Sequence, residues 1–303
     1  MSSNGLVQRI QELKRRRNAV ILVHNYQAPE VQDIADFLGD SLGLSRQAAA
    51  TDADVIVFCG VHFMAETAKI LSPQKIVLMP DVRAGCPMAN MVTPEKLRAV
   101  KAEHPGAPVV TYVNSSAAVK AESDYCCTSA NAIAIARAVP ADEIIFVPDY
   151  HLGHFAAAQC PEKRFVLWRG FCPTHMKISA EDIRRARAAH PHAEVLVHPE
   201  CRAEVIALAD AALSTTGICK RARESHATTL VIGTEVGILH RLRKESPDKR
   251  FAAASERAIC PNMKLATLEK VLWCLEDMSE PIEVPEEIRE RAVRAIERMV
   301  AVG

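Results

Sequence analysis

The sequence carries no excess charge of either sign and few aromatic residues. Its 37 basic and 37 acidic side chains give a formal net charge of zero, and aromatic residues make up 5% of the 303 positions. The charges are interspersed, so there is no basic stripe of the kind that binds nucleic acid or an anionic membrane. We therefore expect a small-molecule partner, no nucleic acid and no membrane.

Long hydrophobic runs are missing as well. The first apolar run, 19–23, is too short for the core of a signal peptide and continues directly into His24 and Asn25. No stretch approaches the length of a transmembrane helix. Ten cysteines without a secretory signal are typical of a cytoplasmic protein whose thiols stay reduced, and such cysteines are buried, catalytic or metal-bound.

The sequence does contain an internal repeat. At 303 residues and 49% hydrophobic content, the chain exceeds the usual size of one domain. Residues 93–114 match residues 179–200, and His24-Asn25-Tyr26 matches Tyr112-Val113-Asn114 in a more diverged first copy. We predict three homologous domains, at 1–86, 87–172 and 173–260. C-terminal helices at 261–303 are expected to pack on them.

Each repeat alternates apolar, β-rich runs with helical stretches. The runs are 19–23, 55–59, 75–79, 109–113, 144–147, 164–168, 195–198, 230–232 and a weaker one near 251. Continuous apolar runs separated by helices predict parallel strands that are covered on both faces. The expected fold class is α/β, with three αβα sandwiches of small parallel sheets around a pseudo-threefold axis.

Polar segments follow the first strand of each repeat, where ligands bind in such sheets. These segments are His24-Asn25-Tyr26, Tyr112-Val113-Asn114 and His198-Pro199-Glu200. About fifteen residues later each repeat has a helix-start signal, at Asp40-Ser41, Thr128-Ser129 and Ser214-Thr215-Thr216-Gly217. A pseudo-threefold axis would direct all of them to one cavity, where helix N-termini suit carboxylates or phosphate.

Three Cys-Pro steps occur at nearly equal intervals, at Cys86, Cys172 and Cys260. A Ser or Thr and then Glu lie shortly beyond each cysteine, which predicts helix starts at Thr93, Ser179 and Thr267. Three thiolates on a common axis form a three-point ligand set for a metal centre. On this ground alone, a Cys₃ zinc site and an iron-sulfur cubane with one open iron both remain possible.

The other cysteines and several histidines receive ordinary interpretations. Cys59 and Cys274 are predicted to be buried hydrophobic residues, and the remaining cysteines have no assigned role. One further side chain follows the second predicted strand of each repeat and could border the cavity or lie in a loop. These residues are His62, Tyr150 and Glu235. His104 and His190 are predicted to be structural, and His175 could support the metal centre.

Along essentially its whole length the sequence resembles the quinolinate synthase family. The matching segments are His24-Asn25-Tyr26-Gln27, Asp33-Ile34-Ala35-Asp36 through Gly39-Asp40-Ser41, Cys86-Pro87-Met88-Ala89-Asn90, Tyr112-Val113-Asn114-Ser115, Cys127-Thr128-Ser129-Ala130-Asn131, His198-Pro199-Glu200-Cys201 and Gly233-Thr234-Glu235-Val236-Gly237. The resemblance implies condensation of iminoaspartate with dihydroxyacetone phosphate in NAD biosynthesis, and L-aspartate oxidase as a possible supplier of iminoaspartate.

The resemblance also implies a 4Fe-4S cluster held by Cys86, Cys172 and Cys260. It assigns substrate binding to His24, Ser41, Tyr112, Asn114, Ser129, His198 and Thr215, with Val113, Pro199 and Thr216 as neighbours. It assigns proton transfer to Glu200 and Tyr26, with Tyr112 and His198 as further catalytic residues. Some relatives continue the last cysteine into a Cys-x-x-Cys-x-x-Cys run, but here 261–264 read Pro-Asn-Met-Lys, so regulation by a disulfide in that run is absent.

Two other functions compete with this one. An iron-sulfur hydro-lyase that acts on another small carboxylic acid would use the same open iron and anion-binding helices. A non-catalytic iron-sulfur or zinc sensor would need a basic or helix-turn-helix output surface, which the balanced charge and the triplicated αβα pattern do not provide.

Overall fold

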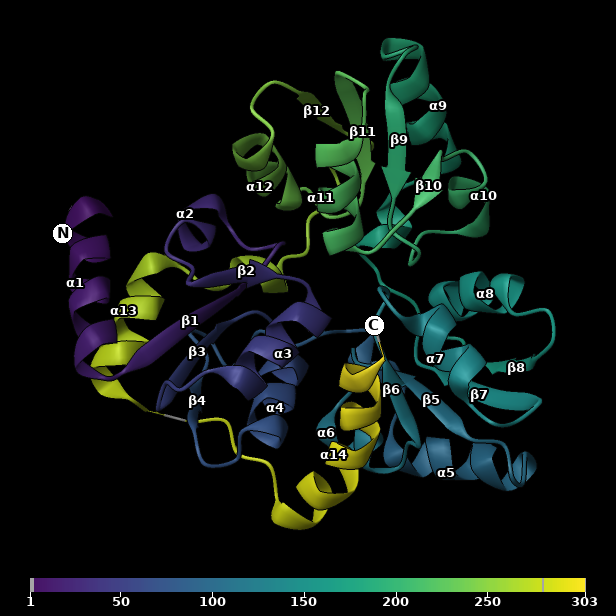
Figure 1. The fold of residues 1–303 in the computed structure, drawn as a ribbon, viewed down its shortest axis with the longest axis horizontal. Coiled ribbons are helices and arrows are strands. Elements are labelled where there is room, and N and C mark those ends of the chain that lie inside the picture. The colour runs from purple at the N-terminus through teal and green to yellow at the C-terminus, as the bar shows by residue number, and fades with distance from the viewer. Residues whose placement is uncertain (1–2, 280, 303) are drawn as a thin grey trace.

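The computed structural model describes residues 3–279 and 281–302, so the outermost ends of the first and last predicted domains lie outside it. Within these residues the chain forms three four-stranded parallel sheets. Figure 1 shows them around a common centre. The first sheet, ordered β2-β1-β3-β4, consists of β1 (Ala19–His24), β2 (Phe37–Gly39), β3 (Val55–Cys59) and β4 (Ile76–Leu78).

The other two sheets repeat this strand order. The second, β6-β5-β7-β8, consists of β5 (Val109–Tyr112), β6 (Tyr125–Cys127), β7 (Glu143–Val147) and β8 (Arg164–Leu167). The third, β10-β9-β11-β12, consists of β9 (Glu194–Val197), β10 (Ala211–Ala212), β11 (Thr229–Gly233) and β12 (Arg250–Ala253). In each sheet the chain leaves the first strand to one side and later returns to the other, which creates a switch point at the strand ends where ligands bind.

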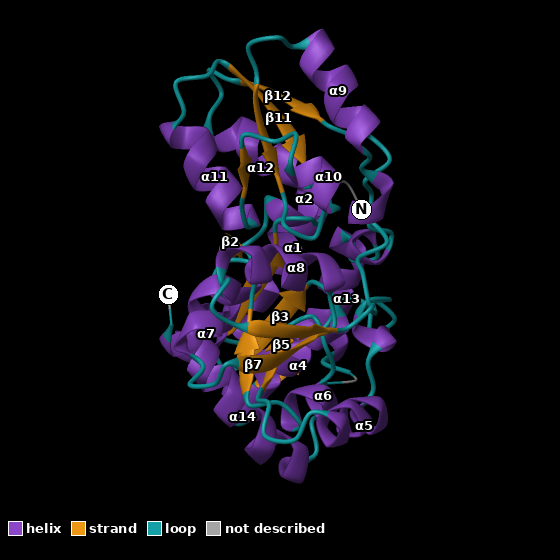
Figure 2. Cartoon of the chain, turned by 90° about the vertical axis from the view of Figure 1, so that its right-hand side faces the viewer, coloured by secondary structure: helices purple, strands orange, loops and turns teal. Residues whose placement is uncertain are grey.

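Helices occupy both faces of every sheet, and the α/β prediction is confirmed. The first unit has α1 (Ser3–Arg16), α2 (Pro29–Gln32), α3 (Ser41–Ala50) and α4 (His62–Leu71). The second has α5 (Pro94–Glu103), α6 (Ala117–Ala121), α7 (Ala132–Ala138) and α8 (Tyr150–Gln159). The third has α9 (Ala180–Ala189), α10 (Ala203–Ile206), α11 (Thr215–Glu224) and α12 (Ile238–Glu245). In Figure 2, α9 and α11 lie on opposite sides of the strands of this unit.

Two C-terminal helices follow, α13 (Leu268–Asp277) and α14 (Glu286–Ala301). Helix α13 packs beside α1, so the last part of the chain helps to cover the first sheet (Figure 1). Helix α14 packs on α6 and α4, between the first two units. In the part of the chain that the structure describes, no helix has the length and apolar composition needed to cross a membrane.

Alternate residues of the central strands pack into different hydrophobic clusters. In β3, Ile56 and Phe58 join a cluster with α3 and α4, whereas Val55 and Val57 join one with α1 and α13. The inner faces of all three sheets share the first of these clusters. Burial on both faces explains why the strands read as continuous apolar runs.

Each predicted strand is present, but the sequence analysis missed one strand in every sheet. The missed strands are β2, β6 and β10, which lie at sheet edges and contain two or three residues. An edge strand of this length needs no apolar run, because only a few residues contact the core. Sequence periodicity therefore carries no signal for them.

Equivalent polar side chains support the repeat independently of the cysteines. One aspartate per unit accepts the backbone N–H of a residue in the first strand, namely Asp36 from Ile21, Asp124 from Val109 and Asp210 from Val195. One lysine per unit donates to two carbonyl oxygens near the carboxyl end of α3, α7 or α11; these are Lys75, Lys163 and Lys249. The three units thus share a polar framework that their hydrophobic pattern does not determine.

The predicted helix starts are largely confirmed. The side chains of Thr93, Ser179 and Thr267 each accept a backbone N–H in the first turn of the helix that follows. One prediction was wrong: α7 does not begin at Thr128-Ser129 but at Ala132, with Asn131 before it. The Asn131 carboxamide oxygen accepts hydrogen bonds from both the backbone N–H and the hydroxyl of Thr128, which holds this segment as a turn.

Candidate active site

A cavity of about 220 Å³ lies where the three units meet. The first strands of all three sheets supply lining residues at their carboxyl ends, and the loops that follow the last strands of all three sheets supply the cysteines. Predicted site residues that line it are His24, Tyr26, Ser41, Tyr112, Asn114, Ser129, His198, Glu200, Thr215, Cys86, Cys172 and Cys260. The fold therefore brings together residues that are far apart in the sequence.

Several neighbouring residues do not line this cavity. Val113 and Pro199 are buried and Thr216 is exposed on α11, and their role as neighbours of the binding residues stays a prediction. His62 instead lies 3.8 Å from Glu66 in an ion-pair geometry. Tyr150 is 41% exposed on the surface. By contrast, His175 and Glu235 do border the cavity.

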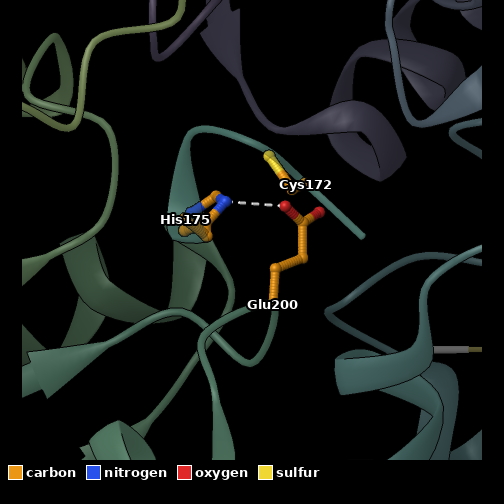
Figure 3. Close-up of side chains that lie close together, drawn as sticks. All are labelled: Cys172, His175 and Glu200. Carbon is orange, nitrogen blue, oxygen red and sulfur yellow. Dashed lines mark ion pairs between the residues drawn. The ribbon is translucent and has the colours of Figure 1, made fainter. Parts of the chain in front are cut away.

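Glu200 is the central carboxylate of the site and is only 3% exposed. Its Oε1 accepts a hydrogen bond of 2.5 Å from the Tyr112 hydroxyl, and its Oε2 lies 2.7 Å from His175 Nδ1 (Figure 3). Burial alone would raise the pKa of Glu200, but His175, His198 and the Tyr112 hydrogen bond together lower it. The site therefore holds a buried carboxylate in its ionised form.

A chain of close polar contacts leads from Glu200, through its ion pair with His175, to a second tyrosine. His175 Nε2 lies 2.8 Å from the Thr234 hydroxyl, which is 2.6 Å from the Tyr26 hydroxyl. Burial is the main cause that raises the pKa of both Tyr26 and Tyr112. Both tyrosines are therefore neutral donors, and protons can move between Tyr26 and Glu200 through Thr234 and His175.

His24 and His198 have matching environments in the first and third units. In each, Nδ1 accepts a backbone N–H from two residues further along, at 3.2 Å from Tyr26 and at 3.3 Å from Glu200. Burial, the largest cause in both, lowers the pKa of His24 to about 4 and of His198 to about 3. Both imidazoles are therefore neutral near pH 7 and carry their proton on Nε2.

This burial makes stability depend on pH. An imidazole whose pKa falls from about 6.5 to about 4 on folding contributes stability that is full above pH 6.5 and lost as the pH falls toward 4. For His24 the expected loss is about 3 kcal/mol by pH 4. We expect urea unfolding of His24→Gln to show a shallower decline from pH 7 to pH 4.5 than unfolding of the unchanged protein.

The exposed His226 provides the matched control, because His226→Gln makes the same chemical change outside the core. Nearby Asp40, Glu200 and Lys264 also act on His24, so both variants are compared in the same background. An unchanged slope in His24→Gln would mean that this imidazole is already charged in the folded state.

The three cysteines occupy equivalent loops. Each lies beyond the last strand of its sheet and precedes a short 3₁₀ turn, namely η1 (Ala89–Met91), η2 (His175–Lys177) and η3 (Asn262–Lys264). Backbone N–H groups beside each sulfur lower its thiol pKa; they belong to Met88 and Ala89 for Cys86, His175 for Cys172, and Asn262 and Met263 for Cys260. Burial is the largest cause that raises the pKa of all three thiols, for Cys86 to about 12. They need a nearby cation to become thiolates.

Comparison with known proteins identifies the family to which this chain belongs. The family model described as quinolinate synthetase A protein matches residues 8–301. The chain is 56% identical over 302 residues to the quinolinate synthase of Geobacter metallireducens, covering 100% of this chain and 99% of that protein. The chain belongs to the quinolinate synthetase A family.

Other members of the family match over similar lengths. The quinolinate synthase of Dehalococcoides mccartyi strain CBDB1 is 55% identical, with 97% of each chain covered. Quinolinate synthase 1 of Methanosarcina acetivorans is 53% identical, with 100% of this chain and 99% of that protein covered. Membership of a family of enzymes excludes the non-catalytic sensor.

The structure of this family member adds Asp149, which the sequence analysis missed, and gives hydrogen-bond partners for Glu235. Asp149 follows β7 in the second unit, and Glu235 follows β11 in the third. Glu235 Oε1 accepts the backbone N–H of Cys260 at 3.1 Å, and the buried Asp149 accepts the backbone N–H of Leu152 at 2.7 Å. Val61 takes their place in the first unit. The same offset of 86 that revealed the repeat separates Asp149 from Glu235, so this signal was available in the sequence.

One group of side chains is close enough to share a metal ion. The ligand atoms of Cys172, His175 and Glu200 lie within 4.8 Å of one another (Figure 3). Sulfur, imidazole nitrogen and carboxylate oxygen all bind transition metals. The site therefore has the donor chemistry of a metal centre. All ten cysteines in the described part of the chain are free thiols.

Proposed function

We propose that the chain condenses iminoaspartate with dihydroxyacetone phosphate to form quinolinate, phosphate and water, using a 4Fe-4S cluster held by Cys86, Cys172 and Cys260. The observation that carries this proposal is that one cavity contains both these cysteines and the polar residues at the strand ends. The curated relatives of the family are named quinolinate synthase, which supports this reaction over that of another iron-sulfur hydro-lyase.

The spacing of the thiols favours a cluster over a single zinc ion. A zinc ion with Zn–S bonds of about 2.3 Å would draw three sulfurs to within about 4 Å of one another. Among the described residues, the group close enough to share one ion contains Cys172 without the other two cysteines. In a cubane the three thiolates ligate different irons, which suits a wider spacing. Backbone N–H groups that lower the pKa of each thiol also suit cluster ligation, because they favour the thiolate.

The chain's own residues would bind and orient the substrates. Ser41 and Thr215 begin α3 and α11, so their hydroxyls lie beside helix N-termini that attract carboxylate or phosphate. Ser129 and Asn114 would bind further polar groups from the second unit. Asn114 Oδ1 is buried and has no hydrogen-bond partner among residues 3–279 and 281–302, which supports a ligand contact at this atom.

Proton transfer would fall to Glu200 and the tyrosines. Glu200 is ionised and can remove a proton as the enamine carbon attacks the phosphate-bearing terminal carbon of dihydroxyacetone phosphate and phosphate leaves. Tyr112 could return a proton at one end of the carboxylate, and Tyr26 could do so through His175 and Thr234. When bound, the cluster would supply a Lewis-acidic iron for the departing hydroxyl.

The domain boundaries, the cellular location and the supply of iminoaspartate are proposed as well. The division into domains at 1–86, 87–172, 173–260 and 261–303 is retained as a hypothesis. Free thiols and a reducible cluster suit a cytoplasmic enzyme. L-Aspartate oxidase could supply iminoaspartate.

An anaerobic preparation tests this function. We expect four irons and four sulfides per chain, and quinolinate formed from dihydroxyacetone phosphate and enzymatically generated iminoaspartate. Zinc without product would replace the cluster by a Cys₃ zinc site. Activity on malate-like acids without a triose phosphate would instead support the hydro-lyase.

A further inference from the structure

Asn25 is a buried residue of the first unit that contacts two helices of the third. Its Nδ2 donates to the Thr215 hydroxyl at the start of α11 over 2.8 Å. Its Oδ1 accepts from Arg241 Nη1 of α12, also over 2.8 Å. Asn25 is completely buried and Thr215 is only 3% exposed, so neither can exchange these partners for bulk water.

The chemistry of Arg241 determines the orientation of the amide. A guanidinium only donates hydrogen bonds, so the Asn25 atom that faces it must be the carbonyl oxygen. The amide nitrogen must then face Thr215, and the Thr215 oxygen acts as acceptor in that contact. The hydroxyl proton of Thr215 is consequently free to point elsewhere, and Thr215 lines the cavity.

Arg241 is itself held firmly. Its Nη1 also donates to the Leu38 carbonyl oxygen at 2.9 Å, and its Nε donates to Glu245 at 2.6 Å. Helix α12 is further tied to the first unit, because His240 and Lys244 contact Asp33 at 2.9 and 2.7 Å. The guanidinium therefore has a fixed position from which to orient Asn25.

This arrangement occurs at one of the three equivalent positions. The residues that correspond to Asn25 in the other units are Val113 and Pro199, and neither side chain can donate a hydrogen bond. In the second unit, Ser129 instead lies 3.0 Å from His198 Nε2, the nitrogen that carries the imidazole proton. The Thr215 and Ser129 hydroxyls thus each accept one hydrogen bond from the protein. The proton of each hydroxyl is then available for a hydrogen bond to a ligand.

We propose that Asn25 and Arg241 are positioning residues that make the Thr215 hydroxyl a dedicated hydrogen-bond donor to an anionic oxygen of the bound dicarboxylate. This inference rests on the proposed binding of substrate in the cavity. The role of Asn25 and Arg241 differs from a structural role, because these residues set the direction in which the Thr215 hydroxyl proton points. An acceptor in place of the Asn25 amide nitrogen would draw that proton away from the ligand.

Asn25→Asp makes this change with nearly no change in shape. The new carboxylate keeps its partner Arg241, which also keeps it ionised, so the buried charge is compensated. Its second oxygen faces Thr215 and accepts the hydroxyl proton. We expect the dissociation constant of quinolinate, measured by anaerobic calorimetry, to rise by about 10- to 100-fold, with iron content and melting temperature little changed.

A double-mutant cycle separates proton direction from a general defect. Thr215→Val should weaken quinolinate binding by a similar factor, and Asn25→Asp should then add less than about twofold in the Thr215→Val background. Thr215→Ser keeps the hydroxyl, so in this background Asn25→Asp should again weaken quinolinate binding by its full factor. If Asn25→Asp proves insoluble, Arg241→Met releases the amide and should weaken binding only when a hydroxyl is present at 215.

Equal effects of Asn25→Asp in both backgrounds, or no effect in the unchanged background, would overturn the inference. Its failure can be distinguished from failure of the proposed function. If the loaded enzyme forms no quinolinate from the two substrates but the cycle is non-additive for this dicarboxylate, the hydroxyl assignment stands and the proposed substrates do not.

Discussion

Replacing Glu200 by Gln should reduce kcat by about 10²- to 10⁴-fold, the usual contribution of a general acid-base residue, while leaving four irons in the protein. Gln has the same shape and can still accept the Tyr112 hydrogen bond through one oxygen. It cannot take up a proton, and it removes the negative charge beside His175 Nδ1. The expected loss is therefore in turnover and not in folding.

The measurement combines steady-state kinetics with iron and sulfide analysis of the anaerobic protein. Glu204→Gln is a matched control, since Glu204 is exposed on α10 only four residues further along the chain. A variant at Glu200 that keeps full kcat would remove this residue from proton transfer. A variant that loses iron would assign it to the support of the metal centre, next to Cys172.

The repeat made much of this site predictable. Equal spacing of Cys86, Cys172 and Cys260, and of the polar strand ends, was enough to place these residues in one cavity, because three copies of one fold present equivalent loops to the same centre. The contacts within the cavity were not predictable. The pairing of Glu200 with His175, for example, joins loops from different parts of one unit at a distance that depends on packing.

Single-copy features were the hardest to find. Asn25 reads as an ordinary polar residue between His24 and Tyr26, and its function depends on Arg241, which is 216 positions away. The counterparts of Asn25 are Val113 and Pro199 and those of Arg241 are Phe155 and Thr67, so neither residue recurs in the other units. Likewise, Thr216 shares its segment with Thr215 but faces solvent, because successive residues on a helix point in different directions.

Changing Cys172 to Ala should remove the cluster and reduce activity by about 100-fold or more, because a loss of ligands is at least as damaging as a loss of their supporting hydrogen bonds. Burial raises the pKa of Cys86, Cys172 and Cys260, so none of these thiols ionises easily without a bound cation. Two remaining thiols would form a weak chelate. We expect iron content below about one tenth of that of the unchanged protein.

Cys160 gives the sharpest control, since the first and third units have Ser72 and Ser246 at its equivalent position. In all three units this residue caps a helix, and its carbonyl accepts the N–H of the repeated lysine, Lys163 in the second unit. Cys160→Ser should therefore leave iron, sulfide and activity unchanged. Equal iron loss in both variants would contradict cluster ligation by the cavity cysteines. Loss of iron and activity in Cys172→Ala alone would support a cluster that is held in the cavity and needed for turnover.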